Sequence, residues 1–186
     1  MSDLLQQRAK AIRLLMLDVD GVLTDGKLYF GNNGEEMKTF CTLDGHGIKM
    51  LQKSGVRVGI ITGRKSELVR RRASDLGITI LLQGREDKWD ALQELFADKT
   101  LFETPVAPEN IAFMGDDWPD LTVMSRVGLA LTVANAHHSV AERAHWQSHL
   151  RGGEGAVRDA CDMIMKAQNT FERALSYYLP DSPGTE

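Results

Sequence analysis

The sequence predicts a single α/β domain built on a doubly wound parallel sheet. Short apolar runs typical of buried strands alternate with segments of helical character along most of the chain. Acidic, hydroxyl and glycine residues repeatedly follow these runs, as expected where the carboxyl ends of parallel strands share one edge of a sheet. The 186 residues, 42% of them hydrophobic, suffice for one domain over residues 1–186 with a substantial core.

The overall charge and the cysteine content exclude several classes of protein. The formal net charge is −4, and the 22 lysines and arginines are spread along the chain, so no basic surface for nucleic acid is expected. The N-terminus lacks the apolar region of a signal peptide, and no stretch approaches the length of a membrane span. Cys41 and Cys161 stand far apart and form no paired ligand motif. We therefore expect a cytoplasmic protein that binds neither nucleic acid nor membrane.

A predicted helix over residues 3–11 leads into the first strand, residues 14–17, and the following loop carries two carboxylates. Asp18 and Asp20 come directly after four large apolar residues, so both are expected at one end of the sheet. Such carboxylates repel each other unless a cation lies between them or one is protonated, which favours a hard divalent ion. A surface turn rich in aspartate and glycine is the alternative. A calcium loop of the EF-hand kind is excluded, because the fifth and sixth positions counted from Asp18 are apolar.

The next segment, residues 25–41, is predicted to form a β-hairpin, called the flap below, and a helix over residues 43–54 follows it. Two short segments of strand character flank a turn of sequence GNNG. The apolar side chains of the flap have little of the chain to pack against, so we expect copies of the chain to bury them in an oligomer. The alternative is a flap that folds back on its own domain. These side chains are Leu28, Phe30, Met37 and Phe40.

A hydroxyl and a glycine follow the second predicted strand, residues 56–61. Thr62 and Gly63 stand at its carboxyl end, and a helix predicted over residues 66–76 begins close by. A hydroxyl, a glycine amide and a helix N-terminus together can bind an oxyanion or a phosphate. The string GIITGRKS has too few residues between its glycines for a nucleotide-binding loop, which we exclude.

Two further predicted strands, residues 78–82 and 111–115, introduce a lysine and a second acidic cluster. Lys88 lies in the first turn of a helix predicted over residues 87–96, where a lysine is unusual because it opposes the helix dipole. A solvated surface lysine is the alternative explanation. The later strand ends in the acidic string DDWPD, residues 116–120.

The remaining sequence predicts a fifth strand, residues 127–133, and a helix over residues 136–144. Two adjacent histidines at the start of this helix are expected to be exposed rather than to bind a metal. In the tail, residues 151–186, a glycine-rich joint precedes a helix predicted over residues 156–178. Two segments are expected without regular structure, the turn-rich connector 98–110 and the frayed end 180–186.

Four of these features, in this order, resemble the four motifs of the haloacid-dehalogenase-like hydrolase superfamily. They are the string DVDGVLTDG, the strand end ITGR, Lys88 and the string GDDWPD. Longer strings, among them GNNGEEMKTF, DGHGIKML and GGEGAVRDACDMI, are similar to the 3-deoxy-D-manno-octulosonate 8-phosphate phosphatases, which dephosphorylate an acidic sugar on the way to bacterial lipopolysaccharide. The resemblance covers nearly the whole chain. It implies a Rossmann-like sheet without a separate cap domain, a Mg²⁺ ion, and a homotetramer built through the flap.

The resemblance also implies a catalytic role for four residues. Asp18 would attack phosphorus and become a transient aspartyl-phosphate, and Asp20 would protonate the departing alkoxide and then activate water. Thr62 and Lys88 would hold the phosphoryl oxygens. Charge neutralisation is the physical need behind this arrangement, because two unit charges about 4 Å apart at an effective dielectric of about 20 repel by about 4 kcal/mol.

Metal and substrate residues are implied in the same way. Asp116 would complete the Mg²⁺ site with the Asp18 carboxylate and the backbone carbonyl of Asp20, while Asp117 and Asp120 would steady that site or Lys88. The implied substrate-binding residues lie after the flap, at the second strand end and in the tail, and are Cys41, Thr42, Leu43, Asp44, Gly45, Lys49, Gly63, Arg64, Arg72, Lys88 and Arg158.

Without a cap, the resemblance implies that a neighbouring subunit covers the site, and residues 151–158 are expected to reach over it, with Arg158 binding an anionic substrate in trans. The predicted reaction is hydrolysis of an acidic sugar phosphate. Two other functions are left open, a phosphatase for a nine-carbon sialic-type sugar phosphate and a non-catalytic tetramerising module. The intact set of catalytic residues argues against the module.

Overall fold

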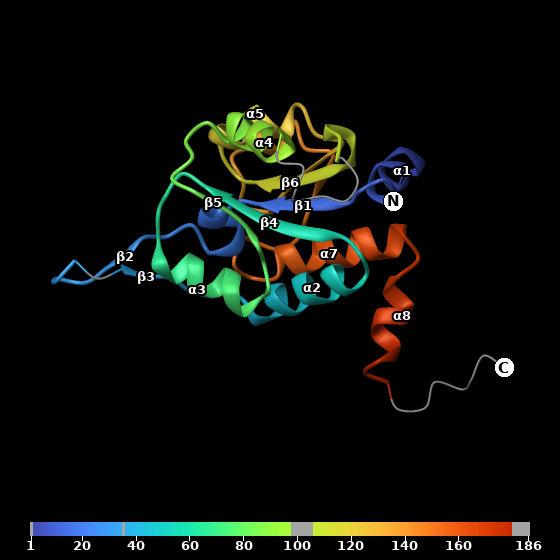
Figure 1. Cartoon of the computed structure of the whole chain (residues 1–186), viewed down its shortest axis with the longest axis horizontal. Helices are drawn as coiled ribbons and strands as arrows, with labels where there is room; N and C mark the ends of the chain where they lie inside the picture. The colour runs from blue at the N-terminus through green and yellow to red at the C-terminus, as the bar shows by residue number, and fades with distance from the viewer. Residues whose placement is uncertain (1, 35, 98–105, 180–186) are drawn as a thin grey trace.

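A six-stranded parallel sheet forms the centre of this computed structural model, which describes residues 2–34, 36–97 and 106–179 (Figure 1). The strand order is β5-β4-β1-β6-β7-β8, and every neighbouring pair is parallel. The predicted doubly wound sheet is confirmed. The strands are β1 Leu14–Leu17, β4 Arg57–Thr62, β5 Ile80–Gln83, β6 Ile111–Gly115, β7 Leu129–Thr132 and β8 Trp146–Gln147.

Helices cover both faces of the sheet because the buried strands are apolar on both sides. In β1, Leu15 and Leu17 face one hydrophobic cluster, and Leu14 and Met16 face the other. In Figure 1, α2 and α7 lie on one side of the sheet, and α4 and α5 lie on the other. The first cluster includes residues of α1 Asp3–Lys10, α2 Thr42–Lys53, α3 Glu67–Asp75 and α7 Ala156–Ala167; the second includes residues of α4 Lys88–Ala97, α5 Leu121–Met124 and α6 His138–Ala141.

The chain reverses its direction of travel across the sheet between β1 and β6. From β1 it passes to β4 and β5 on one side, and it then returns to β6, which pairs with the other side of β1. Ligands of open parallel sheets bind at the carboxyl ends of the strands at such a switch point. The loops after β1, β4 and β6 therefore meet where a site is expected.

The flap forms the predicted hairpin, but with shorter strands. Its strands β2 Tyr29–Phe30 and β3 Glu36–Met37 pair antiparallel and project from the body of the molecule (Figure 1). Phe30 is 66% exposed and Met37 is 62% exposed, whereas Phe40 packs against the core. The alternative in which the flap folds back on its own domain therefore does not hold for Phe30 and Met37.

The prediction of one continuous helix over residues 156–178 is wrong. This segment divides into α7 and α8 Phe171–Ser176, and between them Asn169 adopts a positive φ of 58°. Asparagine tolerates this left-handed conformation better than most residues. At the break, the Gln168 amide donates hydrogen bonds to the carbonyls of Ala9 and Ile12, so that the end of α7 is tied to the last turn of α1 and to the residues that follow it.

A few short elements were not predicted. The edge strand β8 and helix α5 are absent from the sequence-based assignment. Short helical turns occupy residues 108–110 and 118–120, and residues 19–23 form an irregular turn in which Asp20 and Gly21 are not helical. The predicted connector 98–110 lies outside the described residues up to residue 105, and the predicted frayed end 180–186 lies wholly outside them. Within the part of the chain that the structure describes, no helix combines the length and apolar character needed to cross a bilayer.

Candidate active site

A cavity of about 600 Å³ opens at the carboxyl ends of β1, β4 and β6. The structure therefore brings together side chains from distant parts of the sequence, as the strand-end pattern predicted. The lining includes every residue expected to act in catalysis or metal binding, namely Asp18, Asp20, Thr62, Lys88, Asp116, Asp117 and Asp120, together with Gly63 and Arg64.

Lys88 lies between two carboxylates at the floor of this cavity. Its Nζ atom is 2.8 Å from Oδ1 of Asp18 and 2.6 Å from Oδ1 of Asp120, and the residue is only 5% exposed. Burial alone would lower the pKa of Lys88, but the two carboxylates outweigh it and raise that pKa above its ordinary value. The interpretation of Lys88 as a solvated surface lysine is wrong.

Asp120 organises the loop after β6. Its Oδ2 accepts hydrogen bonds from the backbone N–H groups of Asp116, at 2.9 Å, and Asp117, at 3.1 Å, while its Oδ1 accepts from Lys88. Both of its oxygens are thus engaged by the protein. This arrangement fixes the backbone of Asp116 without using the Asp116 carboxylate.

Three carboxylates concentrate negative charge at the site. Oxygen atoms of Asp18, Asp116 and Asp120 all lie within 4.8 Å of one another. Burial, followed by repulsion from Asp120 and Asp18, raises the pKa of Asp116 to about 8. Burial and repulsion from Asp120 raise the pKa of Asp18 to about 6, although Lys88 opposes the shift. A divalent cation with oxygen ligands would relieve this repulsion.

Local backbone geometry supports a cation here. Gly21 adopts a φ of 97°, and a Cβ atom on it would lie 2.1 Å from Oδ2 of Asp116. Only glycine therefore lets the Asp116 carboxylate approach the loop after β1 so closely. The oxygen donors at this position, together with their raised pKa values, fit a hard divalent ion such as Mg²⁺.

The Asp20 carboxylate lies outside this cluster. Its Oδ1 is 2.5 Å from Nζ of Lys38, and its Oδ2 is 3.7 Å from Nε of Arg64. Arg64 was expected to bind substrate, and here it approaches Asp20. Lys38 was not among the predicted site residues, because a lysine on a hairpin carries no sequence signal that separates it from a solvated one.

Thr62 closes the cavity at the end of β4. The residue is 2% exposed, and its hydroxyl oxygen accepts a hydrogen bond of 3.3 Å from the backbone N–H of Arg64. Gly63, between them, is exposed. A phosphoryl group entering the cavity would therefore meet the Thr62 hydroxyl on one side and the Lys88 ammonium on another.

Most of the other predicted substrate-binding residues lie on or beside the N-terminal end of α2, with Lys49 further along the helix. A guanidinium N–H of Arg72 donates to the backbone carbonyl of Cys41 at 3.1 Å, and Oδ1 of Asp44 accepts from the backbone N–H of Arg158 at 2.8 Å. A Cβ on Gly45 would lie 2.3 Å from this Arg72 side chain. Of the described residues that line the catalytic cavity, none belongs to this group, and the substrate-binding roles stay predictions. Thr42, Leu43 and Lys49 are exposed on α2.

The segment expected to reach over a neighbouring site packs on its own subunit. The backbone N–H of Gly153 donates to the carbonyl of Val22 at 3.0 Å, and a Cβ on Gly152 would lie 1.7 Å from the carbonyl oxygen of Gly21. These two glycines therefore pack against the loop after β1. The prediction that Arg158 acts in trans stays untested, and its Nε bonds Asp162 at 2.7 Å.

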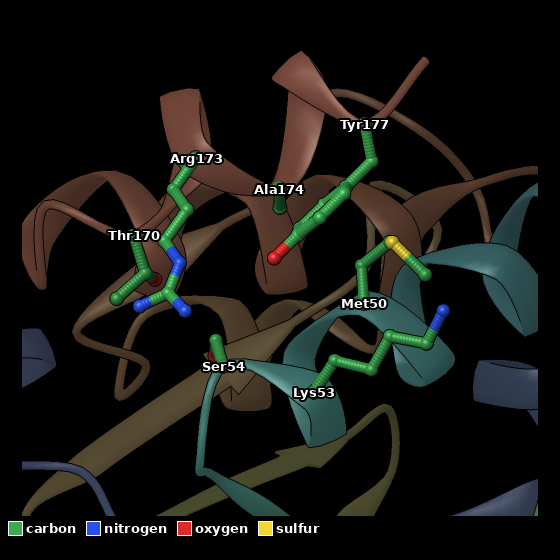
Figure 2. A pocket seen from close by; sticks show the side chains of 7 residues that line it. All are labelled: Met50, Lys53, Ser54, Thr170, Arg173, Ala174 and Tyr177. Carbon is green, nitrogen blue, oxygen red and sulfur yellow. The ribbon is translucent and has the colours of Figure 1, made fainter.

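A second hollow, of about 440 Å³, lies between α2 and α8 (Figure 2). The Ser54 and Thr170 hydroxyls that line it already donate to backbone carbonyls of their own segments. Its side chains come from different elements than those of the acidic cavity, so it is a separate feature. The lining is Met50, Lys53, Ser54, Thr170, Arg173, Ala174 and Tyr177.

The adjacent histidines expected to be exposed also have a structural explanation. Nδ1 of His137 accepts hydrogen bonds from the indole N–H of Trp118, at 3.1 Å, and from the backbone N–H of Ser139, at 3.2 Å. This nitrogen caps α6 and is not free to bind a metal. Among the described residues, the clustered metal-ligand candidates are the three carboxylates alone.

Four features of this doubly wound sheet define a haloacid-dehalogenase-like hydrolase. They are a carboxylate loop after β1, a hydroxyl at the end of β4, a buried lysine at the start of α4 and an acidic loop after β6. No protein-family model matches the chain. A 3-deoxy-D-manno-octulosonate 8-phosphate phosphatase, KdsC, of Salmonella typhi is 48% identical over 167 residues, which cover 90% of this chain and 86% of that relative. By this similarity the chain belongs to the family of 3-deoxy-D-manno-octulosonate 8-phosphate phosphatases.

Solved structures agree with this assignment. The crystal structure of a probable YrbI family phosphatase from Pseudomonas syringae has a TM-score of 0.92 at 53% identity, covering 97% of this chain and 99% of that one. The 3-deoxy-D-manno-octulosonate 8-phosphate phosphatase from Moraxella catarrhalis, in complex with a magnesium ion, a phosphate ion and KDO, has a TM-score of 0.91 at 36% identity, covering 96% of this chain and all 100% of that one.

Proposed function

We propose that this protein is a Mg²⁺-dependent phosphomonoesterase that hydrolyses 3-deoxy-D-manno-octulosonate 8-phosphate to the free sugar acid and phosphate, in the synthesis of lipopolysaccharide precursors. The observation that carries the proposal is the buried Lys88 ammonium between the Asp18 and Asp120 carboxylates, beside Asp116. A positive charge at this position can hold a phosphoryl group against the nucleophile. The names of the similar proteins support the substrate, which the cavity alone does not specify.

In the proposed reaction, the Asp18 carboxylate attacks phosphorus. A bond forms between an Asp18 oxygen and phosphorus while the bond from phosphorus to the sugar oxygen breaks, and Asp20 donates a proton to the departing alkoxide. A water molecule then attacks the aspartyl-phosphate, Asp20 takes its proton, and phosphate and free Asp18 are regenerated. Thr62 and Lys88 hold the phosphoryl oxygens throughout.

The Asp18 and Asp116 carboxylates and the backbone carbonyl of Asp20 would hold the Mg²⁺ ion. When bound, Mg²⁺ supplies positive charge that offsets repulsion between the anionic nucleophile and the phosphate. The fold brings the two carboxylates together although burial and mutual repulsion disfavour their ionised forms, as their raised pKa values indicate. Asp117 and Asp120 would hold the loop that carries Asp116, as the bonds from both backbone N–H groups to Asp120 suggest.

We further propose that the flap joins subunits into a homotetramer, in which a neighbour covers the open cavity. Leu28, Phe30 and Met37 support this, since all three are exposed on one projecting hairpin. Substrate binding would then use the residues at the N-terminal end of α2 and Arg158. A cytoplasmic reaction is in keeping with Cys41 and Cys161, which are free.

The test is a phosphate-release assay on the purified protein with 3-deoxy-D-manno-octulosonate 8-phosphate and with a nine-carbon sialic-type sugar phosphate, each with Mg²⁺ and with a chelator. We expect Mg²⁺-dependent release, faster from the eight-carbon substrate, and none above background from Asp18→Asn. Faster turnover of the nine-carbon substrate would support the alternative phosphatase. No turnover of either substrate or of a generic aryl phosphate would support the non-catalytic module.

A further inference from the structure

Lys38 reaches from the flap to the carboxylate of Asp20, a residue that lines the catalytic cavity. It follows β3, and its Nζ lies 2.5 Å from Oδ1 of Asp20 and 3.1 Å from Oε1 of Glu36. Its side chain is only 2% exposed, whereas that of Lys27, on the same flap, is 74% exposed. The Lys38 ammonium is therefore enclosed by two carboxylates, and it differs in kind from a solvated flap lysine.

The Asp20 and Asp18 carboxylates are positioned by different parts of the chain. Asp18 is bonded by Lys88, which belongs to the core helix α4 and is nearly buried. For the Asp20 carboxylate, the close partner is Lys38, while the Arg64 side chain is 3.7 Å away and 52% exposed. The backbone of Asp20 is extended, with φ −78° and ψ 110°, in the turn after β1. The core thus fixes one of the two carboxylates, and the flap fixes the other.

Among the described residues, other attachments of the flap are of a different kind: Phe40 packs against the core and the Cys41 carbonyl accepts a hydrogen bond from Arg72, both at the C-terminal end of the flap. Its two strands have two residues each, and Phe30 and Met37 are turned to solvent in the single chain. The Tyr29 hydroxyl bonds Asp25, which also lies within the flap. An enclosed, charge-assisted bond to Asp20 is therefore a principal link between this hairpin and the loop after β1.

We propose that Lys38 is a positioning residue for Asp20. Lys38 orients the Asp20 carboxylate at the cavity, and it makes the position of that carboxylate depend on how the flap packs on the domain. The role in catalysis rests on the proposed function, in which Asp20 transfers the proton; the contact itself does not. Any event that moves the flap toward or away from the domain, including assembly of subunits through it, would then also change the position of the Asp20 carboxylate.

The kinetic test compares Lys38→Met with Lys27→Met, a matched loss of charge on the same flap. The substrates are 3-deoxy-D-manno-octulosonate 8-phosphate, whose alkoxide must be protonated as it leaves, and dinitrophenyl phosphate, whose leaving group needs no proton. We expect Lys38→Met to lower kcat for the sugar phosphate by roughly tenfold or more, a part of the roughly hundredfold or greater effect of general acid catalysis. KM, and the single-turnover phosphorylation of Asp18 by the aryl phosphate, should change little.

Three outcomes would overturn the proposal. A rise in KM with unchanged kcat would make Lys38 a substrate ligand. An equal loss in the single-turnover phosphorylation of Asp18 by both substrates would make it a general electrostatic group, and an equal loss in Lys27→Met would make the effect one of flap charge. Partial recovery of kcat in Lys38→Arg, which keeps a donor to Asp20, is expected if the contact is what matters.

A second measurement needs no catalysis, so it decides the proposal even if the proposed function fails. Amide hydrogen exchange in residues 26–34 and 36–40 should accelerate in both Lys38→Met and Asp20→Ala, and the double variant should exchange no faster than either. Lys27→Met should exchange like the unmodified protein. Unchanged exchange in Lys38→Met, or additive effects in the double variant, would show that the Lys38–Asp20 contact does not seat the flap.

Discussion

Asp44, in the first turn of α2, accepts a hydrogen bond at 2.8 Å from the backbone N–H of Arg158, which lies 114 positions further along the chain. Arg158 is in the first turn of α7, whose N-cap residue, Gly155, has no side chain to satisfy the free N–H groups there. The Asp44 carboxylate supplies this cap from another helix. A residue expected to touch substrate is therefore a buried link, 2% exposed, between α2 and α7.

Substitution of Asp44 should affect stability according to whether the acceptor survives. Asp44→Ala leaves the α7 N–H groups without their acceptor and should lower the free energy of unfolding by about 1–2 kcal/mol. Asp44→Asn keeps an acceptor oxygen and removes a carboxylate whose pKa is raised by burial. It should therefore lower the free energy of unfolding by less than Asp44→Ala does. Urea denaturation measures both, with the exposed Asp75→Asn as control. Equal costs for Ala and Asn would contradict the capping role.

Residues at strand ends were predictable because the geometry of a parallel sheet is general. Asp18 and Asp116 stand directly after apolar runs, and any parallel sheet that pairs those runs brings the two carboxylates to one edge. Periodicity therefore sufficed to predict acidic residues at one edge of the sheet, and the resemblance to the hydrolase superfamily implied that Asp116 joins Asp18 in one site. No knowledge of individual side-chain contacts was needed.

Contacts between elements were not predictable in this way. The pairing of Lys38 with Asp20, and that of Asp44 with Arg158, depends on how a hairpin and two helices settle on the sheet, which no local pattern records. The break at Asn169 was missed for a related reason. Helical propensity on either side of it gives no signal of a break, and the hydrogen bonds of Gln168 that stabilise the break go to residues far away in the sequence.

The metal-free protein should lose stability as the pH rises, and Mg²⁺ should reverse this loss. Burial and the Asp120 and Asp18 carboxylates raise the pKa of Asp116 to about 8, above the value of about 3.9 expected in the unfolded chain. The folded protein therefore binds this proton more tightly, and the associated stability, fully present below about pH 4, is lost as the pH rises through about 8. Each kcal/mol lost lowers Tm by about 2–4 °C for a chain of this size.

Thermal unfolding with a chelator and with Mg²⁺, at several pH values between about 5 and 9, measures this effect. The rise in Tm caused by Mg²⁺ should grow with pH, because the metal binds the ionised carboxylate. Asp116→Asn should flatten the pH dependence in chelator and remove most of the response to Mg²⁺. A Mg²⁺ effect of equal size at every pH would show that these carboxylates do not form the metal site.

Assembly should depend on the exposed side chains of the flap. The double variant Phe30→Ser, Met37→Ser removes two large apolar groups that the single chain leaves 66% and 62% exposed. We expect its dissociation into smaller species at concentrations where the unmodified protein is assembled, with little change in the unfolding of each subunit, because neither residue belongs to the core. Light scattering after size exclusion, over a range of protein concentrations, reports the mass. Leu4→Ser, at 61% exposure on α1, is the control; equal masses for all three proteins would exclude assembly through the flap.

Removal of the Lys88 charge should abolish most of the activity without a matching loss of fold. Lys88→Met leaves Asp18 and Asp120 facing each other without the ammonium that now lies 2.8 Å from one and 2.6 Å from the other. A phosphoryl group then loses one of its two expected protein contacts in the cavity, and the pKa of Asp18, already raised to about 6 by burial, loses the cation that lowers it. We expect kcat/KM to fall by at least about a hundredfold, equivalent to about 2.7 kcal/mol of transition-state stabilisation.

Steady-state phosphate release at saturating Mg²⁺ measures the loss, and the exposed Lys53→Met serves as the control. The proposed Mg²⁺ site uses Asp18, Asp116 and the backbone carbonyl of Asp20 and not the position of the ammonium, so raising the Mg²⁺ concentration should not restore the rate. Full recovery at high Mg²⁺ would mean that Lys88 only assists metal binding and does not contact the phosphoryl group.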